Sequence, residues 1–86
     1  MLKIIFRKSF EKSLLKFSHI ERKRILKKIS DLSEEKENLD IKKLHPKDKN
    51  WYRLRIGRYR VIFKYETKRV ILFEVDSRDR IYFYVS

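Results

Sequence analysis

Residues 51–63 have the sequence WYRLRIGRYRVIF, which predicts a β-hairpin. β-Branched and aromatic residues run on both sides of the polar turn Gly57-Arg58, as is typical of two short strands. Side chains alternate between the two faces of a strand, so one face of this hairpin is apolar and the other is cationic. The cationic face collects Arg53, Arg55, Arg60 and Lys64. We therefore expect a sheet with one face for packing and the other for a negatively charged ligand.

The residues that flank the hairpin extend this sheet. Runs of β-branched and aromatic residues predict strands over Trp51–Ile56, Tyr59–Glu66, Arg69–Asp76 and Ile81–Val85, and a first strand over Leu2–Arg7. Short polar turns separate the later strands, which favours an antiparallel meander. Before the hairpin, the apolar side chains of residues 39–44 are expected to hold a connecting loop against the core.

Two amphipathic helices are predicted between the first strand and the hairpin. Ser9 is the expected N-cap of the first helix, whose apolar face carries Phe10, Leu14 and Phe17. The second helix begins at the capping box Ser18-His19-Ile20-Glu21. Its apolar stripe consists of Ile25, Ile29 and Leu32. The sequence therefore predicts an α+β fold of the order β-α-α-β-β-β(-β): an N-terminal strand, an antiparallel helical hairpin and a twisted antiparallel sheet.

Length and composition narrow the class of protein. The 86 residues are enough for one compact domain, which we place at residues 1–86. The 24 Lys and Arg against 12 Asp and Glu give a formal net charge of +12, which favours a polyanionic partner such as nucleic acid. With no Cys and two His, the sequence predicts neither a metal site nor a cofactor site. It contains no signal peptide or membrane span, so a cytoplasmic protein is expected.

The choice between Lys and Arg changes along the chain. Residues 1–50 contain twelve Lys and three Arg, whereas residues 51–86 contain two Lys and seven Arg. The planar guanidinium grips phosphate with two hydrogen bonds and stacks on bases, whereas Lys is a strongly hydrated point charge. The sheet half of the chain is therefore the expected site of phosphate recognition. The alternative interpretation is a solvated strand face without a ligand.

The hairpin sequence resembles the Tyr-Arg-Leu-Arg-Val-Gly-x-Tyr-Arg-Val-Ile-Tyr core of RelE-like toxins in the RelE/ParE superfamily. Leu44 matches the Leu of the family's Lys-Leu pair. Residues 77–82, SRDRIY, are similar to the family's closing His-Arg-x-x-Val-Tyr. The resemblance thus covers nearly the whole chain. It departs from the family at Arg53 and Arg55, where Lys is common, and at Ser77, where His is common.

This resemblance implies a toxin of a type II toxin-antitoxin system that acts as a ribosome-dependent endoribonuclease. Such toxins enter the ribosomal A site, beside 16S rRNA, and cut messenger RNA by attack of a ribose 2′-hydroxyl on the adjacent phosphate, without a metal. By position, the catalytic residues are Arg53, Arg55, Arg60, Arg78 and Tyr82. The expected RNA-binding residues are Arg53, Arg55, Arg58, Lys64 and Arg80. The expected partners are messenger RNA on the ribosome and a cognate antitoxin.

Three questions stay open at the level of the sequence. Arg is a poor general base, so deprotonation of the 2′-hydroxyl falls to Tyr82, to Lys64, or to the ribosome and substrate themselves. Tyr82 also has a plain structural interpretation as a half-buried strand residue. The alternative functions are a ParE-like inhibitor of DNA gyrase without nuclease activity and a non-catalytic RNA-binding module.

Overall fold

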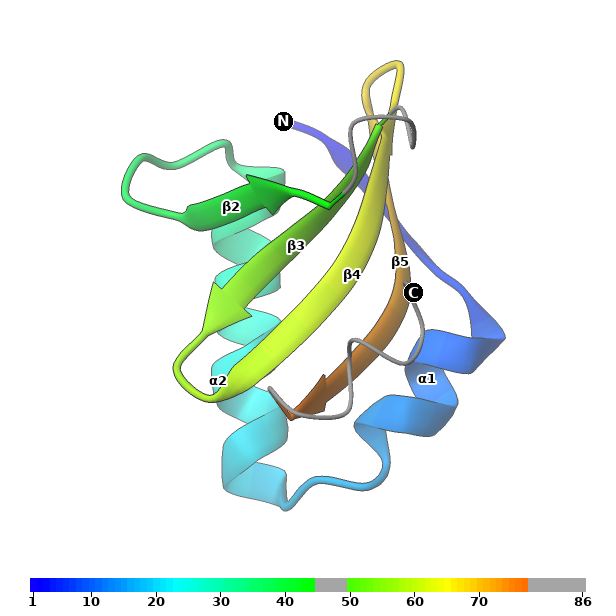
Figure 1. The fold of residues 1–86 in the computed structure, drawn as a ribbon, viewed down its shortest axis with the longest axis vertical. Coiled ribbons are helices and arrows are strands. Elements are labelled where there is room, and N and C mark those ends of the chain that lie inside the picture. The colour runs from blue at the N-terminus through cyan, green and yellow to red at the C-terminus, as the bar shows by residue number, and fades with distance from the viewer. Residues whose placement is uncertain (45–49, 78–86) are drawn as a thin grey trace.

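The computed structural model describes residues 1–44 and 50–77 of the chain, and Figure 1 shows their fold. Within these ranges the elements are β1 (Lys3–Phe6), α1 (Lys8–Leu14), α2 (His19–Ser33), β2 (Asp40–Lys43), β3 (Trp51–Ile56), β4 (Tyr59–Glu66) and β5 (Arg69–Ser77). The predicted α+β class and the order of the first six predicted elements are confirmed. The last predicted strand, residues 81–85, lies outside the described residues.

The strands of the described residues form one mixed sheet in the order β1-β5-β4-β3-β2. β3, β4 and β5 pair antiparallel, as the sequence predicts, and β2 pairs antiparallel to β3. β1, however, pairs parallel to β5, with Lys3 opposite Arg69 and Phe6 opposite Leu72. The prediction of an entirely antiparallel sheet is therefore wrong at this edge. The two helices lie between β1 and the rest of the sheet in sequence, and their long crossover makes the parallel pairing possible.

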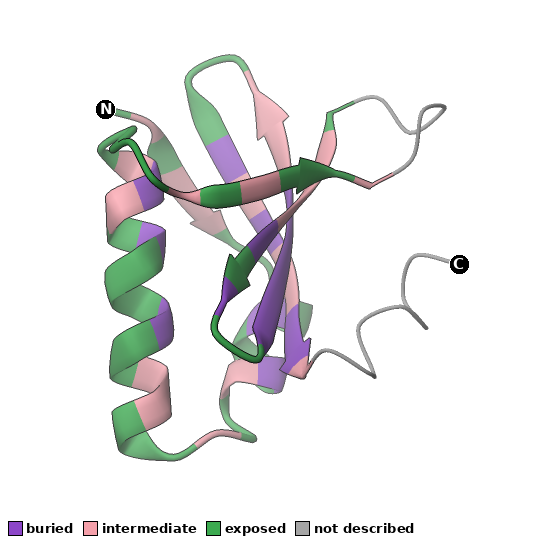
Figure 2. Cartoon of the chain, turned by 60° about the vertical axis from the view of Figure 1, so that its left-hand side comes forward, coloured by how far each residue is buried: buried purple, intermediate pink, exposed green. Residues whose placement is uncertain are grey.

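One face of the sheet is covered by α2, and α1 lies beside β5 (Figure 1). The predicted stripe Ile25, Ile29 and Leu32 is buried on α2, and Figure 2 shows it turned toward the strands. The apolar face of the sheet meets it with the buried side chains of Leu54, Ile56, Tyr59, Val61, Phe63, Val70, Leu72 and Val75. Phe10 of α1 completes this core. The period-2 and period-3.6 patterns thus place the core as expected.

The capping box at the start of α2 forms as predicted. The Ser18 hydroxyl accepts from the backbone N–H of Glu21 at 3.2 Å, and the Glu21 carboxylate accepts from the backbone N–H of Ser18 at 2.9 Å. The prediction for α1 is wrong in its cap: the N-cap is Arg7, which makes no side-chain cap hydrogen bond. Ser9 instead donates its hydroxyl to the carbonyl oxygen of Phe73 at 2.6 Å. It therefore ties α1 to β5.

The segment before the hairpin contains a strand that the sequence did not predict. Residues 40–43 form β2 and pair with β3, where a connecting loop was expected. Ile41 is the one apolar residue of this DIKK sequence, and it is half-buried against the core. The strand adds Asp40 and Lys42 to the outer face of the sheet, the face away from α2.

Candidate nucleic-acid interface

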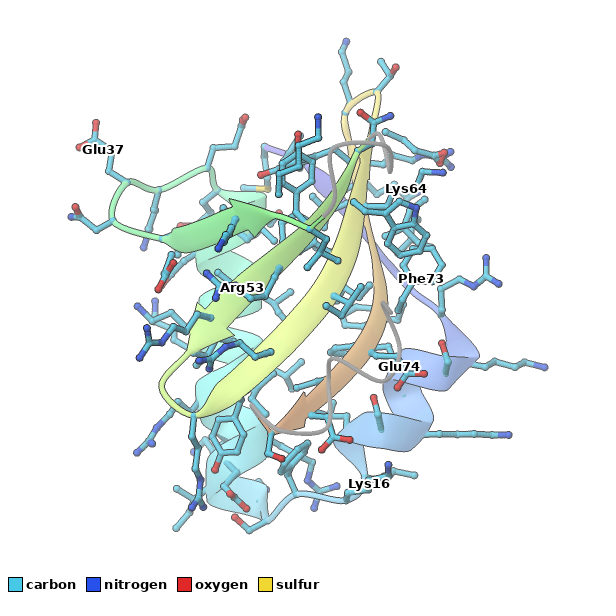
Figure 3. All side chains as sticks on the ribbon, viewed as in Figure 1. Lys16, Glu37, Arg53, Lys64, Phe73 and Glu74 are labelled. Atoms are coloured by element: carbon cyan, nitrogen blue, oxygen red, sulfur yellow. The ribbon has the colours of Figure 1, made fainter. Side chains whose placement is uncertain are left out.

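The β3–β4 hairpin places the predicted cations on the outer face of the sheet. Arg55 stands opposite Arg60, Arg53 opposite Ile62, and Trp51 opposite Lys64. Alternate residues of paired strands lie on one face, so Arg53, Arg55, Arg60 and Lys64 share it. Figure 3 looks onto this face and labels Arg53 on β3 and Lys64 on β4. The geometric prediction of a shared cationic face is therefore confirmed.

The four cations differ in their exposure to solvent. The Arg55 side chain is 52% exposed, whereas that of Arg53 is 13% exposed. Arg60 is buried, with 3% of its surface exposed, and its Nη1 donates to the carbonyl oxygens of Gly57 at 3.0 Å and Tyr59 at 3.1 Å. Asp76 of β5, also buried, stands opposite Arg60 in the sheet register. Arg55 is thus the arginine of this group that is most available to a ligand.

Asp40 of β2 pairs with both arginines of β3. Its Oδ1 accepts a hydrogen bond from Arg53 Nη2 at 3.0 Å, and its Oδ2 lies 3.9 Å from Arg55 Nη1. The Asp40 side chain is itself 53% exposed. Arg53 Nε is buried and has no hydrogen-bond partner among the described residues. The role of Asp40 was not predicted because β2 was not predicted. The available signal was the two-residue spacing of Asp40 and Lys42, which places both on one face of a strand.

Arg58, predicted to bind RNA, points away from the outer face. Its guanidinium lies 5.4 Å from the centre of the Tyr59 ring, and its Nη2 is 3.3 Å from Glu21 Oε2 on α2. Tyr59 donates its hydroxyl to the same carboxylate oxygen. This bond to Tyr59, the bonds from Ser18 and the neighbouring Arg58 together lower the pKa of Glu21 from 4.5 to about 2. The contacts of Arg58 link the hairpin turn to α2, so Arg58 stands apart from the other predicted cations.

An aromatic pair lies beside the cations on the outer face. The rings of Trp51 on β3 and Phe73 on β5 have their centres 4.4 Å apart. Lys64 Nζ lies 5.8 Å from the centre of the Trp51 ring, and the Arg7 guanidinium lies 5.2 Å from that of Phe73. A register shift between β4 and β5 at Ile62/Phe63 accompanies Phe73, which has no partner in the ladder. Sequence periodicity does not predict such a shift.

Glu74 of β5 lies at the side of the outer face that borders α1 (Figure 3). Burial raises the pKa of its carboxyl group, and the positive charge of Lys16 partly offsets that effect. The sequence pattern alone does not single out Glu74. Glu74 stands opposite Ile62 in the β4–β5 register, two residues from Asp76, which stands opposite Arg60.

Arg78, Arg80 and Tyr82 lie outside the described residues, so their predicted roles remain predictions. In residues 1–44 and 50–77, no group of three or more His, Cys, Asp or Glu side chains is placed to hold a metal ion. The helices of the same ranges include none that is both long enough and apolar enough to cross a membrane.

Solved structures of toxin-antitoxin proteins have the same fold. A chain of the RelB–RelE antitoxin–toxin complex from Methanococcus jannaschii is 30% identical, with a TM-score of 0.75 over 95% of this chain and 99% of that chain. One from the archaeal RelE–RelB complex of Pyrococcus horikoshii OT3 is 26% identical, with a TM-score of 0.73 over 92% and 97%. The isolated RelE toxin of E. coli shares 15% identity and the fold, with a TM-score of 0.73 over 99% and 95%.

The family is shown by the sequence together with these structures. No curated protein sequence matches the chain. A family model described as the ParE toxin of the type II toxin-antitoxin system parDE matches residues 4–82. This match includes both helices, the hairpin and the segment that resembles the family's closing motif. The chain therefore belongs to the ParE toxin family of type II toxin-antitoxin systems, within the RelE/ParE superfamily.

Proposed function

We propose that this toxin is an endoribonuclease that cuts messenger RNA in the ribosomal A site, and so inhibits translation in the cytoplasm. The observation that supports this proposal best is the row of Arg53, Arg55, Arg60 and Lys64 on one face of the β3–β4 hairpin. Arginines on a strand face match phosphate groups, and the neighbouring Trp51–Phe73 pair offers an aromatic surface of the kind on which RNA bases stack.

The proposed reaction is the attack of a ribose 2′-hydroxyl on the adjacent phosphate, which leaves a 2′,3′-cyclic phosphate and a 5′-hydroxyl. Negative charge accumulates on the phosphate oxygens in the transition state, and preorganised guanidinium groups stabilise that state more than the ground state. Arg55, which is half-exposed, and Arg53 beside it are the proposed contacts to the phosphate.

The remaining residues have proposed roles of different kinds. Arg60 is buried, so we assign it first to the rigidity of the hairpin turn, whose carbonyl oxygens it binds. Arg78 and Tyr82 are carried over from the family resemblance, as transition-state contact and as a base-stacking or proton-transfer group. Lys64 and Arg80 are proposed contacts to the RNA backbone. The proton acceptor for the 2′-hydroxyl is Tyr82, Lys64, or a group of the ribosome or substrate.

A cognate antitoxin is the second proposed partner. The solved relatives from Methanococcus jannaschii and Pyrococcus horikoshii are complexes of a toxin with an antitoxin. With a formal charge of +12, this chain favours an antitoxin segment that is acidic or amphipathic and that covers the outer face of the sheet.

One observation favours a second candidate function. The matching family model is that of ParE toxins, and the resemblance to the ParE branch implies inhibition of DNA gyrase. A gyrase inhibitor has no need of a phosphate site on the sheet. The two functions therefore differ in their dependence on the exposed arginine Arg55.

The test pairs two assays on the same protein. Inducible expression is followed by primer extension on a translated message, and the purified protein is added to a gyrase supercoiling assay. The proposal predicts codon-phased cuts in the message and unchanged supercoiling. Lost supercoiling without cuts would support the gyrase function. RNA binding with a steep salt dependence and no cut product would identify a non-catalytic RNA-binding module.

A further inference from the structure

Asp40 occupies the place in the outer face where the proposed function puts a phosphate. β2 pairs with β3 so that Asp40 stands opposite Arg55 and Lys42 opposite Arg53. The two carboxylate oxygens of Asp40 are directed to different arginines, Oδ1 to Arg53 at 3.0 Å and Oδ2 to Arg55 at 3.9 Å. A carboxylate and a phosphate offer a guanidinium the same pair of oxygen acceptors. The geometry of the free protein thus resembles that of an anion-bound site.

The arginine partners of Asp40 are not saturated by it. Arg53 is mostly buried, yet its Nε has no hydrogen-bond partner among the described residues. The distance from Asp40 to Arg55 Nη1 exceeds that of a hydrogen bond. The half-exposed Arg55 guanidinium therefore keeps a donor that the carboxylate does not reach at hydrogen-bond distance. The two non-bridging oxygens of an RNA phosphodiester are not tethered to β2, so they are able to approach both arginines more closely than Asp40 does.

The position of Asp40 also allows its carboxylate to move away from the two arginines. Its side chain is 53% exposed, and it belongs to a four-residue strand at the edge of the sheet. Rotation of the side chain returns the carboxylate to water and does not bury an unpaired charge. Loss of such an exposed ion pair costs little free energy.

We propose that the Asp40 carboxylate is an internal competitor for the anion site formed by Arg53 and Arg55, displaced when the phosphate of single-stranded RNA binds there. This inference rests on the proposed function and deepens it by naming the phosphate subsite and the group that limits its affinity. While Asp40 is paired with the two guanidinium groups, it competes with solvent anions for them. A phosphate must displace the carboxylate before it binds, and this lowers the affinity of the site for phosphate.

The experiment measures binding of a fluorescent 2′-O-methyl oligoribonucleotide by anisotropy at fixed salt. Such RNA has no free 2′-hydroxyl, so binding is separated from cleavage. Asp40→Asn is compared with the wild type and with Glu66→Gln. Glu66 is a matched control: it is ion-paired with Arg69 at 3.0 Å, at the other end of β4, and its loss changes the net charge equally.

We expect Asp40→Asn to tighten binding about fivefold more than Glu66→Gln does, the upper value for an exposed ion pair. In an Arg53→Gln background this gain should fall toward that of the control. Thermal unfolding of each variant checks that the fold is kept. Equal affinities for Asp40→Asn and Glu66→Gln, or weaker binding by Asp40→Asn, would overturn the inference but leave the proposed function standing. Absence of RNA binding by all variants would also overturn the inference, whereas the proposed function is decided separately, by primer extension on a translated message.

Discussion

Leu54 and Arg55 are neighbours in β3 that belong to opposite faces of the sheet. Leu54 is fully buried in the core between the sheet and α2, whereas the Arg55 side chain is half-exposed on the outer face. The same alternation divides β4 into the core residues Val61 and Phe63 and the outer residues Ile62 and Lys64. One hairpin therefore supplies both the packing of the domain and its cationic surface.

The two faces differ in how well they tolerate substitutions. The core face is apolar and close-packed, so a substitution that changes the volume of a side chain there destabilises the fold. The outer face is held by ion pairs of small individual free energy, such as those between Asp40 and the β3 arginines. Exposed charges on the outer face can thus be changed without loss of the fold, whereas Arg60 and Asp76 are nearly as buried as the core.

The largest expected effect is on stability and belongs to the core face. Leu54→Ala leaves a cavity under the sheet and should lower the free energy of unfolding by about 2–5 kcal/mol. Arg55→Ala, one residue away, should change it by less than about 0.5 kcal/mol. Urea unfolding of the two variants measures both values. Equal losses would contradict the division of β3 into a packing face and a binding face.

The second effect is on RNA cleavage and belongs to the outer face. Arg55→Ala should lower the rate of ribosome-dependent cleavage about 100-fold, because one preorganised donor to the transition state is lost. Arg69→Ala is the control, since Arg69 is 48% exposed and ion-paired on the same sheet, far from the hairpin turn. Single-turnover cleavage of a ribosome-bound message gives both rates. A similar loss in the two variants would indicate only a general effect of charge.

A smaller effect tests the N-cap of α2, the helix that covers the core face of the sheet. Ser18→Ala removes the hydroxyl that accepts the backbone N–H of Glu21. The free energy of unfolding should fall by about 1 kcal/mol. Chemical denaturation followed by circular dichroism measures the change. Ser30, exposed on the same helix, offers the control substitution Ser30→Ala, which should leave the midpoint close to that of the wild type.

The smallest effect is the acid dependence contributed by Glu21. Its pKa is about 2 in the folded protein, below the ordinary 4.5, so it favours folding above pH 4.5 and loses that contribution as the pH falls toward 2. The free energy of unfolding of the wild type, minus that of Glu21→Gln, should therefore shrink over this interval. Unfolding curves at several pH values measure it. A difference that does not change with pH would rule out the contribution.

Much of the fold was predictable because it depends on local patterns. The strands at residues 51–56 and 59–66 and the start of α2 follow from alternation and from the capping box, which need only neighbouring residues. β1 was predicted as a strand. Its parallel pairing with β5 depends on residues far away in the sequence, so the residues around Lys3 do not predict that pairing. β2 was missed because its one apolar residue, Ile41, gives too weak a period.

The face of the sheet that carries the candidate site was predictable, but the burial of its individual side chains was not. The alternation places Arg53, Arg55 and Arg60 on one face, as the structure has them. Arg60 is buried where its Nη1 binds a turn carbonyl oxygen and where Asp76 stands opposite it in the sheet, an arrangement that a linear pattern does not reveal. Asp40 was missed together with β2, and Arg58 turned toward Glu21 because a partner on α2 was available.

Cleavage of a ribosome-bound message with 2′-O-methyl groups at all three A-site nucleotides tests most directly whether the outer face is a ribonuclease site. The unmodified message is cut in parallel. The account predicts that the toxin cuts the unmodified message and leaves the 2′-O-methyl message intact, because attack requires the 2′-hydroxyl. Equal cutting of both messages, or no cutting of either, would contradict it.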